Sequence, residues 1–172
     1  MLSQELTDQL NHQLSLEFFS ANLYLQMSSW CHSHGLDGCG TFLRQQADEE
    51  RLHMEKFFDY INDAGGYAVI GAIEQPPHTF GTVSDVFEQI YAHECKITKE
   101  INQLLKAAFE AGDFSTFGFL QYFALEQNEE ERLFQSILDK IKLIKVEQQG
   151  LYLFDKEIAS MSKQLQSASS AA

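Results

Sequence analysis

The chain has 172 residues and carries 25 acidic against 12 basic side chains, a formal net charge of −13. Such a charge disfavours binding to nucleic acid or an anionic membrane and favours attraction of cations, although solubility alone would also account for it. The length suits one domain with a substantial core, and 44% hydrophobic residues with two prolines indicate a largely helical globular protein. We therefore expect residues 1–172 to form a single domain.

Three cysteines, Cys31, Cys39 and Cys95, are odd in number and lack the spacing of a zinc site. This favours a reducing compartment over a disulfide framework and leaves the role of the thiols open. The first five residues lack the basic-then-apolar pattern of a secretion signal, and no apolar run reaches the roughly 18 residues of a membrane helix. We expect a cytoplasmic protein that does not enter membranes.

Two long helices are expected before residue 66, the first over about 4–31 and the second over about 40–63, where Gly65 and Gly66 favour a helix end. Each has a seam of inward-facing residues in steps of four and three. The first seam reads Leu10, Leu14, Glu17, Ala21 and Tyr24, and the second reads Leu43, Ala47, Glu50, Met54, Phe57 and Ile61. One glutamate interrupts each seam, and His53 lies on the same helix surface as Glu50.

Residues 67–82 include two glycines and both prolines and show no helical stripe. So long a connection predicts a crossover along the bundle, with the third helix parallel to the second. Ser84 and Asp85 are candidate N-caps of that helix, and Gly112 and Asp113 form a turn into a fourth helix that ends near residue 145. The two seams read Val83, Phe87, Ile90, Glu94, Ile97, Ile101, Leu104, Ala108 and then Leu120, Phe123, Gln127, Glu130, Phe134, Ile137, Ile141, Ile144.

The four-helix pattern over about 4–145 is followed by a short amphipathic segment. We expect a fifth helix over about 151–163 and a frayed tail over 164–172, which is small and polar. The predicted fold is all-α.

Each of the four seams is interrupted near its midpoint, and helix midpoints lie at similar heights in a bundle. Four glutamates, with an imidazole and an amide beside them, should therefore share one buried layer: Glu17, Glu50, Glu94, Glu130, His53 and Gln127. Four carboxylates cannot all be ionised in a dry core, so two divalent cations are expected, and the oxygen-rich donor set suits iron or manganese. The alternative is a metal-free structural bundle with these glutamates solvated.

A second acidic set lies beside the first and consists of Glu49, Glu126 and Glu129. It is either a third, looser cation site or the charged edge of the run 129–131. Tyr24 points toward the same layer and is either a redox-active phenol or a core tyrosine. The other histidines form no ligand pair, and we expect them at the surface or in loops: His12, His32, His34, His78 and His93.

Taken together, the sequence resembles the bacterial non-haem ferritins, members of the ferritin-like di-iron four-helix-bundle family. The motifs are Leu16-Glu17 and Tyr24-x-x-Met27-Ser28, Phe42-Leu43-Arg44 and Glu49-Glu50-x-x-His53-Met54, Phe119-Leu120-Gln121 and Glu126-Gln127-x-Glu129-Glu130-Glu131, and Gly150-Leu151-Tyr152. The resemblance implies an up-down-down-up bundle with a short fifth helix at the four-fold axes of a hollow shell of twenty-four subunits.

The resemblance also implies an activity, the oxidation of Fe(II) by O2 or H2O2 and storage of Fe(III) as mineral. It assigns one iron to Glu17, Glu50 and His53 and a second to Glu94 and Glu130. Glu50 would bridge the two, with Gln127 near the oxygen-binding side. A third iron is assigned to Glu49, Glu126 and Glu129.

Two departures bear on the subtype. The fourth helix has Gln127-x-x-Glu130 where bacterioferritins and many di-iron enzymes have a second Glu-x-x-His. Arg51 stands where the haem methionine of a bacterioferritin would follow the site glutamate, so we expect no haem. A di-iron peroxidase or oxygenase of the rubrerythrin type is the alternative function, but it would be expected to carry the second Glu-x-x-His and a rubredoxin-like cysteine motif.

Overall fold

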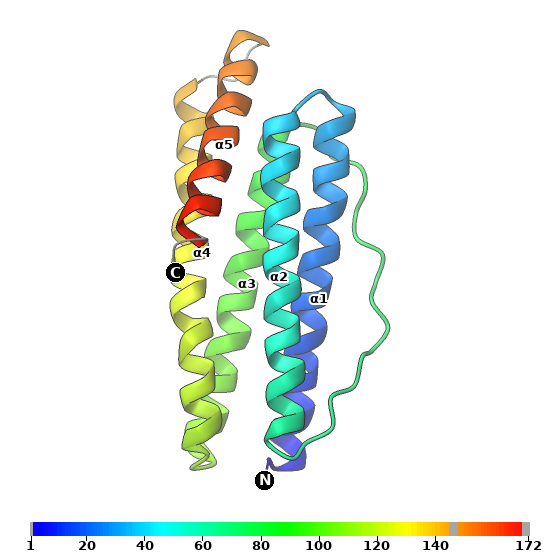
Figure 1. Cartoon of the computed structure of the whole chain (residues 1–172), viewed down its shortest axis with the longest axis vertical. Helices are drawn as coiled ribbons and strands as arrows, with labels where there is room; N and C mark the ends of the chain where they lie inside the picture. The colour runs from blue at the N-terminus through cyan, green and yellow to red at the C-terminus, as the bar shows by residue number, and fades with distance from the viewer. Residues whose placement is uncertain (1, 145–147, 170–172) are drawn as a thin grey trace.

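The computed structural model describes residues 2–144 and 148–169, and within them it contains five helices and no strand. These are α1 (Gln4–Ser33), α2 (Asp37–Asp63), α3 (Val83–Glu110), α4 (Phe114–Ile144) and α5 (Gln148–Ser169). Figure 1 shows α1–α4 as an up-down-down-up bundle, with the connection from α2 to α3 running along its outside. The predicted fold is confirmed. None of the helices in these described ranges is long and apolar enough to cross a membrane.

The helix starts are fixed by hydrogen bonds to their first free amides. The Ser3 hydroxyl accepts from the amide of Leu6 at 3.2 Å at the start of α1. At the start of α3, Thr82 and Asp85 form a capping box, in which each side chain accepts from the backbone amide of the other residue. The N-cap of α3 is thus Thr82 rather than Ser84 or Asp85, because Asp85 occupies the third position of the helix.

The apolar core is divided into two clusters. The upper cluster, at the end of the bundle with the α1–α2 turn, is built around Phe42, Phe87 and Phe134. The lower cluster, at the end with the N-terminus, is built around Leu10, Phe57, Ile101, Leu120 and Phe123. Each of α1–α4 contributes to both clusters. The polar residues that interrupt the four seams lie between them, as expected for a layer at a common height.

Helix α5 folds back along α2 and α4 (Figure 1) and is longer than the predicted 151–163. Its residues Phe154 and Ile158 are buried in the upper cluster. Residues 164–169, expected to fray, continue the helix, because leucine and glutamine favour a helix and extend one that is already anchored. The last part of the predicted tail, 170–172, lies outside the described residues.

Candidate metal centre

The polar layer receives one or two side chains from each bundle helix, because every seam turns its interruption inward. All six of these side chains are almost fully buried, with exposed fractions of 2% for Glu17, 4% for Glu50, 2% for His53, 1% for Glu94, 4% for Gln127 and 7% for Glu130. Burying so many polar groups is costly unless each is hydrogen-bonded, neutralised or bound to a cation. The contacts within the layer show how the chain meets this requirement.

Glu17, Glu50 and His53 form a compact group in which one ligand atom from each lies within 4.8 Å of the others. Glu50 and His53 are three residues apart on α2, with 3.6 Å between the Glu50 Oε2 and the His53 Nδ1 atoms, and Glu17 faces them from α1. In the described part of the chain, this is the one group of three or more Asp, Glu, His or Cys residues arranged so closely. Two carboxylates and an imidazole suit iron, manganese or zinc.

Burial controls the protonation of this group. It raises the pKa of Glu17 from 4.5 to about 7 and the pKa of Glu50 well above its usual range, with a further increase for Glu50 from the neighbouring carboxylates. Burial also lowers the pKa of His53 to about 4, and Lys56 adds to this effect. The imidazole is therefore neutral at pH 7 and keeps a lone pair for a cation, while the carboxyl groups hold protons that a cation can displace.

Glu94 and Glu130 lie on the other side of the layer. The Glu94 carboxylate accepts hydrogen bonds from the Tyr24 hydroxyl and from Gln127 Nε2, the latter at 2.9 Å. Glu130 Oε2 is buried and has no hydrogen-bond partner among the residues that the structure describes. Burial together with Glu94 raises the pKa of Glu130 well above its usual range. An orphaned buried oxygen is what a cation would satisfy. Both carboxylates act on the pKa of Glu50, although neither joins the compact group.

The second acidic set is less buried. Glu49 is half-buried and accepts a hydrogen bond from Gln46 Nε2 at 2.9 Å, and its pKa is raised by burial and then by Glu126, with a smaller contribution from Glu129. Glu126 is half-buried and Glu129 is exposed. The three side chains lie near one another without a compact ligand geometry among the residues described, and a third metal site here remains a prediction.

Comparison with known proteins identifies the family. The sequence model of the ferritin family, described as a ferritin-like domain, matches residues 7–144. The chain belongs to the ferritin family. It is 48% identical to a probable bacterial non-heme ferritin-like protein of Haemophilus influenzae over 162 residues, which cover 94% of this chain and 98% of that protein. It is 43% identical to the bacterial non-heme ferritin of Escherichia coli over 164 residues, covering 95% and 99% of the two chains.

Solved ferritin structures resemble this one closely. An open pore ferritin from Archaeoglobus fulgidus superimposes with a TM-score of 0.90 at 37% identity, covering 92% of this chain and 96% of that one. A ferritin from Chlorobium tepidum superimposes with a TM-score of 0.83 at 44% identity, covering 92% and 97%.

Two neighbours of the layer in this ferritin were not predicted from the sequence. Gln13 is 1% exposed and donates a hydrogen bond from Nε2 to Glu17 Oε1 at 2.7 Å; its position one turn before Glu17 could have revealed it. His93 was expected at the surface or in a loop, and that prediction is wrong. It is half-buried in α3, its Nε2 lies 2.7 Å from the Ser20 hydroxyl, and burial lowers its pKa to about 4. Its place beside Glu94 in the sequence gave no sign of this.

Proposed function

We propose that this ferritin stores and detoxifies iron by oxidising Fe(II) in the buried layer and holding Fe(III) as mineral inside a hollow shell of twenty-four subunits. The observation that carries the proposal is the convergence of four buried carboxylates and one neutral imidazole from four helices. The family, and the non-heme ferritins among its relatives, support iron as the substrate. We place the protein in the cytoplasm and assign it no haem.

The two sides of the layer have different roles in this proposal. Glu17 and His53 bind the first Fe(II), Glu94 and Glu130 bind the second, and Glu50 lies between the two ions. Gln127 and Tyr24 both donate hydrogen bonds to Glu94 and hold its carboxylate in place. Because Glu94 and Glu130 bring no imidazole, the second ion is held more weakly and can leave for the cavity after oxidation.

The reaction balances with two Fe(II) ions per oxidant molecule. Each Fe(II) loses one electron, and O2 takes up two electrons and two protons to give H2O2. Where H2O2 is the oxidant, the same two electrons and two protons break its O–O bond and give two molecules of water. The carboxylates stabilise the greater charge of the Fe(III) product. Glu49, Glu126 and Glu129 are proposed as a looser third site beside this path.

Size-exclusion chromatography after aerobic loading with excess ferrous salt tests the proposal. Iron absorbance that elutes with a very large spherical assembly is the expected result. A small species with only a couple of irons per chain would overturn storage and favour a di-iron peroxidase or oxygenase. A small species without iron would reduce the protein to a structural bundle.

A further inference from the structure

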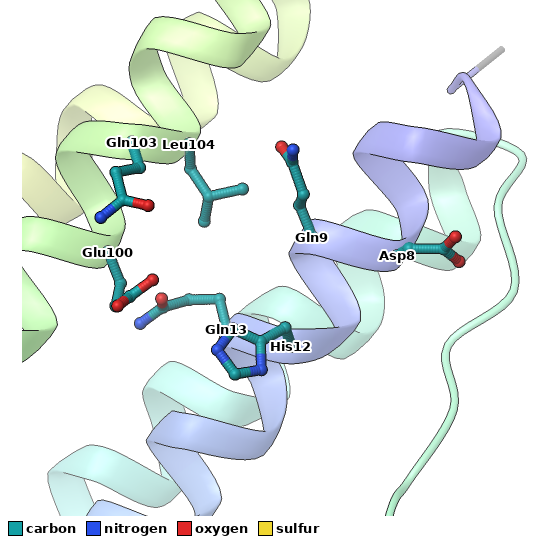
Figure 2. A pocket seen from close by; sticks show the side chains of 7 residues that line it. All are labelled: Asp8, Gln9, His12, Gln13, Glu100, Gln103 and Leu104. Atoms are coloured by element: carbon teal, nitrogen blue, oxygen red, sulfur yellow. The ribbon is translucent and has the colours of Figure 1, made fainter.

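A pocket of about 350 Å³ lies outside the buried layer, between α1 and α3 (Figure 2). Its lining is polar apart from Leu104 and consists of Asp8, Gln9, His12, Gln13, Glu100 and Gln103. Asp8, His12 and Gln103 are exposed, so the pocket opens to solvent, and no lysine or arginine lines it. The pocket therefore joins the solvent to Gln13, whose amide touches the layer.

Gln13 has one satisfied and one unsatisfied end. Its Nε2 donates to Glu17 Oε1 at 2.7 Å, whereas its Oε1 is buried and has no hydrogen-bond partner within residues 2–144 and 148–169. In this orientation the Gln13 amide nitrogen faces the Glu17 carboxyl group and the amide oxygen faces away from it. Figure 2 shows the side chain reaching from α1 toward Glu100 on α3. The carbonyl oxygen of a side chain that is 1% exposed is thus aimed into the pocket without a donor.

Another acceptor lies beside Gln13 in this pocket. The Glu100 carboxylate is half-buried and forms no ion pair or hydrogen bond within the described part of the chain. Gln9 also lines the pocket, but Figure 2 shows its amide group pointing away from Gln13 and Glu100. An amide carbonyl and a carboxylate, in a pocket lined by no lysine or arginine, suit a hard divalent cation that keeps most of its water shell. A buried carbonyl left without any partner would otherwise lower the stability of the fold.

We propose that this pocket is a separate divalent-cation site, bound by Glu100 and the carbonyl oxygen of Gln13. The cation is an Fe(II) ion on its way from solvent to Glu17, and Gln13 links the two sites because its two ends contact the pocket and the layer. The delivery role rests on the proposed function, whereas the presence of a cation in the pocket does not.

Mn(II) is the probe for the site itself. Crystals of the full-length protein soaked in Mn(II) should show anomalous density bound to Glu100 and Gln13, and Glu100→Gln should abolish it while leaving any density in the layer unchanged. Glu88→Gln is the matched control, because Glu88 lies on the same helix, is exposed and does not line the pocket. A parent crystal without Mn(II) in the pocket would overturn the site.

Co(II) absorbance under anaerobic conditions tests delivery, because it reports the arrival of a cation at the imidazole of the layer without any oxidation. The parent and Glu88→Gln should bind at the same rate. Glu100→Gln should bind about three- to ten-fold more slowly, with an unchanged final amplitude, because the pocket has lost its attracting charge. Equal rates in all three proteins would overturn the delivery role. Neither measurement requires iron oxidation, so failure of the proposed function would be recognised separately.

Discussion

Replacing Glu17 by Gln should stabilise this ferritin when metal is removed with a chelator. Glu17 is 2% exposed, and burial raises its pKa from 4.5 to about 7. Between these two values the folded chain binds a proton that the unfolded chain releases. The stabilising effect of that proton is complete below pH 4.5 and is lost as the pH rises through 7.

The size of the effect follows from the two pKa values. At pH 8 the parent has lost about 3 kcal/mol of unfolding free energy relative to pH 4.5 through this one group. Gln has the same shape and no proton to lose, and its carbonyl oxygen can still accept from Gln13. In chelator at pH 8 the variant should therefore melt about 6–12 °C above the parent, with little difference at pH 4.5. Mn(II) should reverse the order, because only the parent retains the full ligand set.

Thermal unfolding followed by circular dichroism at the two pH values, with chelator and then with Mn(II), measures these differences. Glu88→Gln removes an exposed acid from α3 and should change the melting temperature little in any of the four conditions. The reasoning would be refuted if Glu17→Gln melted at or below the parent in chelator at pH 8. Burial would then not raise the pKa of Glu17 in the folded chain.

Four further substitutions test other parts of the structure. His53→Ala and Glu130→Ala should each slow rapid Fe(II) oxidation in a stopped-flow assay by at least about 100-fold, with the elution volume of the assembly unchanged; parental rates in both would contradict the assigned ligands. Gly38→Ala should lower the unfolding free energy by about 1–3 kcal/mol in urea titration, because the new Cβ would lie 2.1 Å from the Asp155 carbonyl oxygen. Asp155→Ala should lower the unfolding free energy by about 1 kcal/mol in the same assay, because the Asp155 carboxylate accepts hydrogen bonds from two amides at the start of α2. An unchanged urea midpoint in either variant would show that α5 does not depend on this contact.

The bundle and its polar layer could be predicted because both are encoded locally. A helical seam depends on side chains three and four residues apart, so each helix shows its own inward face without knowledge of its partners. The polar layer then follows from one further rule, that the midpoints of bundle helices lie at the same height. This rule brings together Glu17, Glu50, Glu94 and Glu130. The division of the core into two apolar clusters at this height bears out that rule.

Contacts set by tertiary placement could not be predicted in the same way. Helix α2 begins after Leu36, which provides no side-chain cap, and the Asp155 carboxylate from α5 accepts from the amides of Gly38 and Cys39 instead. More than one hundred residues separate these partners in the sequence. The burial of His93 similarly depends on Ser20 of α1. Such pairs follow from how α5 and α3 are placed, and no periodicity in either helix records that placement.

In the proposed function, protons and cations compete for the same oxygens, and the buried layer has two forms. With protons bound, the carboxyl groups are neutral, and hydrogen bonds from Gln13, Tyr24 and Gln127 satisfy Glu17 and Glu94. With cations bound, the same oxygens are ionised and the positive ions offset their repulsion. Glu130 Oε2, which has no partner among the described residues, is satisfied only in the second form. The protein alone therefore leaves one buried carboxyl oxygen of the layer without a hydrogen bond. That unpaired oxygen favours the binding of a cation.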